Sequence, residues 1–164
     1  MKNQCRFLMA PEDYQLVIPA SEIFLDRLND TSNHYPAERV RKYFEHYTPE
    51  FFRELIEGSN NYGLLAHFDD RSIDGILIGS NDCSSSNQAH INWIMVASSG
   101  RGIGSKLINC FLDDAQEKGA RSAILNVSKK NEKAIRLYEK LGFKVNSKYS
   151  KGKMLNMKRC LALD

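Results

Sequence analysis

A run of small residues from Ser98 to Ser105 has the composition in this chain best suited to binding an anion. It holds Gly100, Gly102 and Gly104 at alternate positions, with Arg101 between the first two. Glycines let a ligand approach the main chain closely, and a helix that starts at such a loop offers it free N–H groups and a partial positive charge. Because Arg101 adds a full positive charge, the loop favours binding of a phosphate.

The elements on either side of this loop would hold it in place. The apolar run from Ile91 to Val96 predicts a buried strand before it. After it, apolar residues recur at helical spacing, which predicts an amphipathic helix with one buried stripe. The stripe consists of Ile103, Leu107, Ile108, Phe111, Leu112 and Ala115.

The loop matches neither of two common nucleotide-binding motifs. The phosphate-binding loop of nucleotide hydrolases ends in Gly-Lys-Ser/Thr, whereas here Lys106 follows Ser105. A dinucleotide fingerprint needs a glycine three residues after Gly102 or Gly104, where this chain has Ser105 and Leu107. These mismatches disfavour a protein that binds a nucleotide phosphate through the loop alone. A plain strand-to-helix turn remains the alternative that the loop by itself leaves open.

A second block downstream adds to the pattern. A predicted strand from Ser122 to Val127 is followed by Asn131, by a short helix from Ala134 to Leu141 and by Gly142-Phe143. The two blocks together resemble the GNAT superfamily of N-acetyltransferases. Its glycine motif, Arg/Gln-x-x-Gly-x-Gly/Ala, is met from Ser99 to Gly104, with Ser99 in the Arg/Gln place. Its second motif, Asn-x-x-Ala-x-x-Leu-Tyr-x-x-x-Gly-Phe, is met by Asn131, Ala134, Leu137, Tyr138, Gly142 and Phe143.

The resemblance implies acetyl-CoA as acyl donor and gives roles to particular residues. Main-chain groups of the first strand would pair with the pantetheine arm, and those of the loop would hold the pyrophosphate. Asn131 would contact the cofactor, and Tyr138 would lie near the sulfur and act as general acid. Ser99 departs from the family and would weaken the pyrophosphate site, a loss that Arg101 would partly offset. The expected cofactor residues are Ile94, Met95, Val96, Ser99, Gly100, Arg101, Gly102, Ile103, Gly104, Ser105, Asn131 and Tyr138.

A general base is harder to assign, although the attacking amine must lose a proton. Some family members that acetylate proteins carry a glutamate at the position of Asn126, whose amide cannot take up a proton at neutral pH. His90 titrates in the right range and is one candidate, and a route through water is another. By analogy with the family, the helical section would line the acceptor side through Tyr35, Tyr43, His46 and Tyr47.

Composition limits the class of protein. The chain of 164 residues, with 42% hydrophobic and 26% charged residues, suits a single globular domain over residues 1–164. A net charge of +3 gives no reason to expect nucleic acid or a membrane as partner, and no apolar run reaches the ~18 residues of a membrane helix. Four scattered cysteines indicate neither a zinc site nor disulfides, and the cytoplasm is the expected location.

The remaining elements follow from periodicity and turn residues. Before the glycine loop we expect a strand, three helices, a polar loop and two strands joined by a turn at 69–71. These are Gln4–Met9, a helix from Pro11 to about Leu28 kinked or divided at Pro19, the helices Ala37–Tyr47 and from Pro49, the strands Tyr62–Phe68 and Ile73–Ile78, and a loop over Ser80–Gln88 that leads into His90–Val96. After Gly142 we expect strands Phe143–Tyr149 and Met154–Leu161 around a turn at Lys151-Gly152.

This order predicts an α/β (α+β) fold with a mixed, mostly antiparallel sheet of about seven strands, flanked by helices. The resemblance adds that the fourth and fifth strands splay apart to admit acetyl-CoA. The expected activity is transfer of its acetyl group to a primary amine of a small molecule or protein, by a monomer or homodimer without a metal. The alternative is a non-catalytic module of the same fold that binds or senses acyl-CoA.

Overall fold

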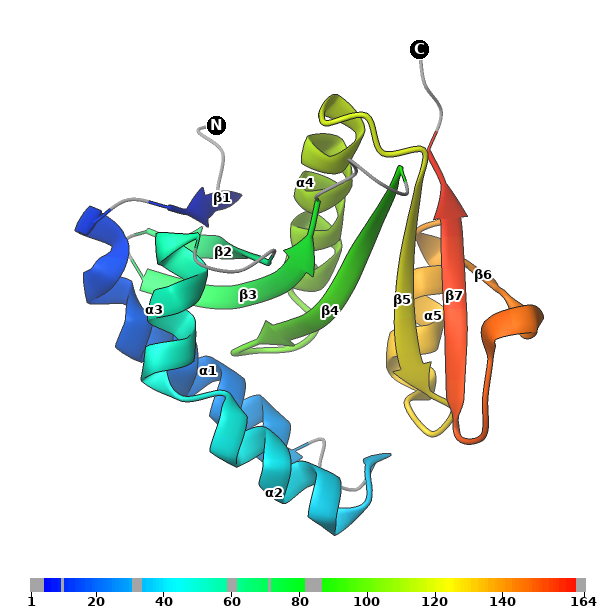
Figure 1. Ribbon diagram of the computed structural model, residues 1–164, viewed down its shortest axis with the longest axis horizontal. Coiled ribbons are helices and arrows are strands. Elements are labelled where there is room, and N and C mark those ends of the chain that lie inside the picture. Colours follow the sequence, from blue (N-terminus) through cyan, green and yellow to red (C-terminus); the bar gives the residue numbers. More distant parts are fainter. Residues whose placement is uncertain are drawn as a thin grey trace.

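In the described part of the chain, seven strands form one sheet with helices on both faces (Figure 1). The computed structural model describes residues 5–9, 11–30, 34–58, 62–70, 72–81 and 87–161. Residue 4 of the expected first strand, residue 71 of the expected turn and most of the expected loop from Ser80 to Gln88 lie outside these ranges.

The elements follow one another in the predicted order, strand, helices, three strands, helix, strand, helix and two strands. The strands are β1 (Cys5–Leu8), β2 (Gly63–Asp69), β3 (Ser72–Ser80), β4 (Gln88–Val96), β5 (Ser122–Ser128), β6 (Lys144–Val145) and β7 (Met154–Cys160). The helices are η1 (Pro11–Leu16), α1 (Val17–Asp30), α2 (Ala37–His46), α3 (Pro49–Glu57), α4 (Ile103–Glu117), α5 (Glu132–Lys140) and η3 (Ser147–Tyr149).

The sheet is mixed and mostly antiparallel, as predicted. Its strand order is β1-β2-β3-β4-β5-β7-β6, and only β4 and β5 run parallel. Their ladder begins at Gln88 opposite Ser122 and stops at Ile91 opposite Leu125. Beyond this point the two strands diverge toward their C-terminal ends (Figure 1). The expected splay between the fourth and fifth strands is therefore confirmed.

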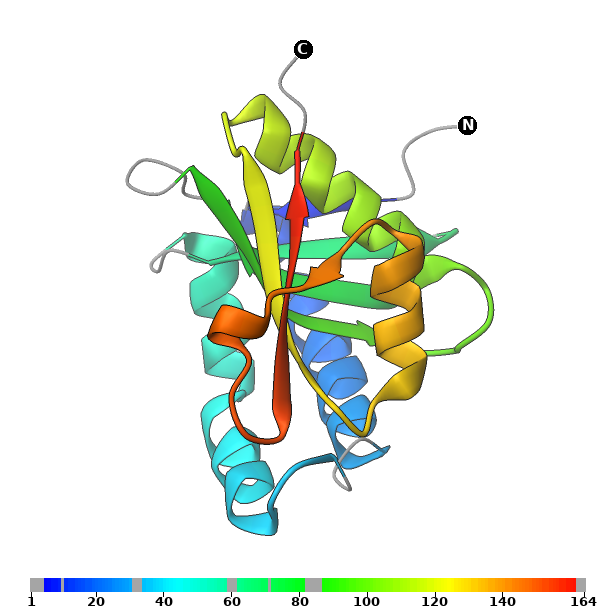
Figure 2. The same ribbon diagram turned by 90° about the vertical axis from the view of Figure 1, so that its right-hand side faces the viewer.

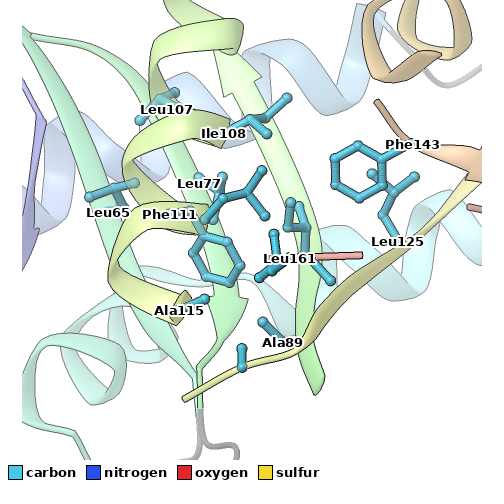
Figure 3. Close-up of a cluster of buried hydrophobic side chains, with 14 of the residues drawn as sticks. Leu65, Leu77, Ala89, Leu107, Ile108, Phe111, Ala115, Leu125, Phe143 and Leu161 are labelled. Carbon is cyan, nitrogen blue, oxygen red and sulfur yellow. The ribbon is translucent and has the colours of Figure 1, made fainter. Parts of the chain in front are cut away.

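Each face of the sheet carries its own hydrophobic core. Helices α4 and α5 cover one face, and α1, α2 and α3 lie on the other (Figure 2). All six residues of the predicted α4 stripe are buried. Figure 3 shows Leu107, Phe111 and Ala115 of this stripe packed toward Leu65 and Leu77 of the sheet. The 3.6-residue period alone was enough to identify the buried side of α4.

Two glycines of β3 let α4 approach the sheet. A Cβ on Gly75 would lie 2.6 Å from Cγ2 of Ile103, and one on Gly79 would lie 2.6 Å from the carbonyl oxygen of His90 and 2.7 Å from the Phe111 ring. Neither position has room for a side chain, so these glycines set how closely the helix that follows the glycine loop packs on the sheet.

Two predicted elements differ from the structure. The helix expected from Pro11 divides at Leu16, where a 3₁₀-helix gives way to α1. Pro19 produces no kink because it falls in the first turn of α1, where a backbone N–H has no intrahelical partner to lose. The division therefore lies three residues before the proline.

The strand predicted over Phe143–Tyr149 is wrong for most of its length. Only Lys144 and Val145 pair with β7, and Ser147–Tyr149 form a 3₁₀-helix. The hydroxyl of Ser150 donates to the carbonyl of Asn146 (3.0 Å) and accepts from the N–H of Asn156 (3.0 Å). Local bonds of this kind compete with a ladder, and they end the strand after two residues.

Candidate active site

A cavity of about 370 Å³ lies where β4 and β5 separate. Three segments form its wall: the C-terminal end of β4, the glycine loop with the first turn of α4, and α5 with the residue that precedes it. One residue of α1 completes it. The lining residues are Arg27, Ile94, Met95, Val96, Ser98, Ser99, Gly100, Gly102, Ile103, Gly104, Ser105, Asn131, Lys133, Ala134, Leu137 and Tyr138.

The structure brings together every cofactor residue expected from the sequence except Arg101. The lining also contains residues that the sequence reasoning did not assign. Ala134 and Leu137 belong to the second motif, so their place in the wall could have been inferred from it. Arg27 lies on α1, far away in sequence, and no local signal marks it.

The glycine loop takes a backbone conformation that side chains disfavour. Gly100 has φ of 89° and Gly102 has φ of 74°, both in the left-handed region. Gly102 precedes the first residue of α4 and offers no side-chain cap. The N–H groups of the first turn, from Ile103 onward, therefore remain available to a ligand, and they carry the partial positive charge of the helix.

Arg101 points away from the cavity, toward the β2–β3 hairpin. Its guanidinium donates to Asp69 at 2.7 Å and lies 3.5 Å from a carboxylate oxygen of Asp74. The hydrogen bond from Arg101 lowers the pKa of the Asp69 carboxyl. Because Asp69 ends β2, this contact links the glycine loop to the hairpin, so that Arg101 fixes the loop from outside.

Asn131 begins α5. Its Oδ1 accepts a hydrogen bond from the N–H of Ala134 at 3.2 Å, which caps the helix. The same residue lines the cavity, as the motif implied. At the other end, Gly142 has φ of 84°, and the N–H of Phe143 donates to the carbonyl of Tyr138 (2.9 Å). The Asn and the Gly of the second motif thus define the start and end of the helix that carries Tyr138.

Tyr138 lines the cavity from α5. Its ring contacts Phe143 edge to face, with 6.0 Å between centroids. Burial raises the pKa of Tyr138 well above its ordinary value, and the neighbouring Tyr35 adds to the shift. The phenol therefore stays protonated at neutral pH and can donate a proton to a group in the cavity.

An aromatic cluster covers the other face of β4. The indole N–H of Trp93 donates to the hydroxyl of Tyr47 at 2.6 Å. The Trp93 ring also contacts Tyr43, at 5.0 Å between centroids, and Tyr35, at 6.3 Å. His46 lies farther out, against Tyr47. Of the four residues expected on the acceptor side, the three tyrosines thus meet on the strand that lines the cavity.

Neither position considered for a general base supplies one to the cavity. His90 is not among the lining residues, and it pairs with Ile124 where β4 and β5 are still hydrogen-bonded. Partial burial lowers the pKa of this histidine. Asn126 accepts a hydrogen bond from the side chain of Asn156 at 3.0 Å. Within the described lining there is no Asp, Glu or His.

One cavity thus brings together the end of β4, the glycine loop with the first turn of α4, and Tyr138 of α5. Residues 25–143, most of the chain, match the family model "Acetyltransferase (GNAT) family", and the protein belongs to that family. Acetyl-CoA is the acyl donor that this family uses.

Solved structures of low sequence identity share the fold. PaiA N-acetyltransferase from Thermoplasma acidophilum, in complex with coenzyme A, has a TM-score of 0.76 at 21% identity, covering 98% of this chain and 100% of that one. An aminoglycoside 6'-acetyltransferase type Ii has a TM-score of 0.70 at 16% identity over 95% and 96%. The ribosomal-protein-S18-alanine N-acetyltransferase from Escherichia coli has a TM-score of 0.58 at 19% identity over 71% and 79%.

The names of these neighbours give an aminoglycoside and an alanine of ribosomal protein S18 as acceptors, so the fold alone does not determine the acceptor. No curated protein is significantly similar to the chain in sequence. Over the described ranges, no helix is long and apolar enough to cross a membrane. The same residues contain no group of three or more His, Cys, Asp or Glu side chains able to hold a metal ion.

Proposed function

We propose that the chain is a single-domain, cytoplasmic N-acetyltransferase that transfers the acetyl group of acetyl-CoA to a primary amine. The observation that carries this proposal is the cavity between β4 and β5, which gathers both family motifs around Tyr138. Bound acetyl-CoA would supply an activated acetyl group as a thioester.

The chain's main-chain groups fit the shape of this cofactor. From Asn92 to Val96 the edge of β4 that faces β5 has no strand partner, because the ladder stops at Ile91. Its free N–H and C=O groups suit the amides of a pantetheine arm, which would add to the edge like a strand. The first turn of α4 would hold the pyrophosphate with main-chain N–H groups. Ser99 lines the cavity where the family motif has a longer Arg or Gln side chain. The main-chain N–H groups would therefore hold the pyrophosphate without help from that side chain.

Tyr138 and the main chain of β4 would have different roles in the reaction. A C–N bond to the acetyl carbon forms as the C–S bond breaks, and the sulfur leaves with the electron pair of that bond. Tyr138 holds a proton at Oη and donates it to the sulfur. Main-chain N–H groups of β4 would polarise the thioester carbonyl. In its described residues this first cavity has no carboxylate or imidazole in its lining, so within it we assign removal of the amine's proton to water.

A thermal melt with acetyl-CoA, CoA and ATP is the first test. A ligand at about 100 times its Kd adds about 2.7 kcal/mol to the free energy of unfolding, or roughly 5–10 °C for a domain of this size. Stabilisation by acetyl-CoA and CoA, but not by ATP, is expected. Tighter binding of ATP would favour the nucleotide-binding hypothesis instead, and absence of any shift would contradict the cofactor site.

The second test replaces the proton donor. Tyr138→Phe removes one oxygen and should lower kcat about 100-fold or more, the usual contribution of a general acid, with little change in the Kd of acetyl-CoA. Tyr149→Phe is the matched control, because Tyr149 is 58% exposed and lies on η3, outside the cavity lining. Equal kcat values in the two variants would show that Tyr138 is not the general acid.

The lack of a titratable base in the lining favours one second candidate, a module that binds acyl-CoA without catalysis. It predicts the same stabilisation by CoA and no acetyl transfer to any amine. Time courses of CoA release with and without a panel of primary amines separate the two, since only the enzyme accelerates release when an amine is added.

A further inference from the structure

A second cavity, of about 230 Å³, lies at the segment that leads into α2. Its wall combines the segment before α2, the end of β5 with the turn that follows it, and the turn before β7. The lining residues are His34, Tyr35, Pro36, Ser128, Lys130 and Lys153. The hydroxyl of Ser128 donates to the carbonyl of His34 at 3.3 Å and so joins two of these segments.

The second cavity lies close to the first along the chain. Lys130, in its lining, immediately precedes Asn131, which lines the first cavity. Tyr35, which also lines the second cavity, contacts the ring of Trp93 on β4 at 6.3 Å between centroids, and the next residue of β4, Ile94, lines the first cavity. A molecule in the second cavity would therefore lie beside the proposed site of acetyl transfer.

The charged side chains that line this second cavity are positive. Lys130 and Lys153 stand exposed at its rim, and within the described residues neither side chain forms an ion pair. No Asp or Glu lines either cavity in the same residues. The acidic residues Glu38 and Glu45 of nearby α2 are already paired, with Lys42 at 3.2 Å and with Arg41 at 3.9 Å.

We infer that the acceptor is a small amine with a carboxylate beside the amino group, as in a free amino acid. This rests on the acetyltransferase function proposed above. The volume suits a molecule of that size. Lys130 and Lys153 would bind the carboxylate, and the amino group would point past Tyr35 to Tyr138. A polycation such as an aminoglycoside or polyamine would bring two or more ammonium groups against two lysines without a compensating acid, so it is disfavoured.

An alternative role for Lys130 and Lys153 is to neutralise a phosphate of the cofactor. Steady-state kinetics with matched acceptors separate the two roles. The acceptors are tyrosine, methionine and glutamate, each as free acid and as carboxamide, with spermidine as polycation. A carboxamide lowers the pKa of the neighbouring amine, which leaves more of it neutral and reactive at a given pH. Faster reaction of the free acid therefore cannot come from amine reactivity and must come from recognition of the carboxylate.

The expected result is a kcat/KM for the free acids at least about tenfold higher than for the amides, the size of one charge-assisted hydrogen bond. Lys153→Gln and Lys130→Gln should reduce that ratio toward one and leave the KM of acetyl-CoA unchanged. Lys144→Gln, on β6 and outside both cavities, is the control and should keep the full ratio.

Three results would overturn the inference: amides or spermidine as better acceptors than the acids, no transfer to any free acid by a protein that acetylates another amine, or lysine variants that raise the KM of acetyl-CoA alone. Failure of the acetyltransferase function itself has a different signature. There no amine of any charge would accelerate CoA release, whether or not CoA stabilises the protein.

Discussion

Asn131 has two tasks in the structure that one substitution can separate. Its Oδ1 caps α5 through the N–H of Ala134 at 3.2 Å, and the residue also lines the cavity proposed for acetyl-CoA. Asn131→Ser keeps a capping oxygen but loses the amide N–H₂ donor, whereas Asn131→Ala loses both. The pair of variants therefore measures the cap and the cofactor contact independently.

The magnitudes follow from these contacts. Loss of a side-chain cap costs about 1 kcal/mol, which lowers Tm by roughly 2–4 °C in a domain of this size. Loss of one hydrogen bond to the cofactor also costs about 1 kcal/mol, or about fivefold in Kd. We therefore expect Asn131→Ser to raise the Kd of CoA about fivefold at a nearly unchanged Tm. Asn131→Ala should show the same rise in Kd together with the drop in Tm.

Calorimetry supplies both numbers, by thermal unfolding without ligand and by titration with CoA. The turnover number kcat is a third measurement, because fraying of α5 would displace Tyr138. We expect kcat to fall in Asn131→Ala and to stay at the wild-type value in Asn131→Ser. A wild-type Kd in Asn131→Ser would show that the residue is only a helix cap. A wild-type Tm in Asn131→Ala would refute the contribution of the cap.

Two further predictions concern pH and packing. Burial raises the pKa of Tyr138 above the ordinary 10.0, so its phenol stays protonated throughout the neutral and mildly alkaline range. In a pH–rate profile at saturating acceptor, kcat should therefore stay constant as the pH rises to about 9.5. A fall in kcat centred near pH 8 would assign the proton donor to another group. Gly79→Ala should destabilise the fold by about 1–3 kcal/mol in denaturant unfolding, since its Cβ would lie 2.6 Å from a backbone oxygen. Gly63→Ala on the paired strand should cost less, because its Cβ would lie 3.1 Å from the Phe7 ring and 3.9 Å from the nearest backbone oxygen.

Local patterns in the sequence were sufficient for most of the fold. The alternation of glycines from Gly100 to Gly104 identified the loop, because the left-handed φ of the first two admits few other residues. The spacing from Asn131 to Gly142 identified α5, since its cap and its terminating glycine are both local features. The helical stripe that begins at Ile103 is buried throughout. In each case the information lies within about a dozen consecutive residues.

Contacts between distant segments were beyond the reach of such patterns. Ser128 and His34 are 94 residues apart, and nothing near either of them in sequence indicates that they meet. The orientation of Arg101 depended on two carboxylates of the β2–β3 hairpin, so its charge was expected in the cavity although it lies outside the lining. The missing strand around Ser147 resulted from competing polar side chains, which propensity averages do not resolve.

The short ladder between β4 and β5 has a consequence for how long the protein lasts in a cell. In the described residues, the ladder between β4 and β5 consists of the pairs from Gln88 to Ile91, and the remaining edge of β4 faces β5 without a strand partner. A molecule that occupies this edge completes the sheet and adds its binding free energy to folding, in proportion to the logarithm of its concentration. The resistance of the protein to unfolding and proteolysis would then rise with the concentration of CoA. The amount of this protein in the cell would in that way depend on the CoA supply, because CoA would bond the part of the β4 edge that β5 leaves unpaired.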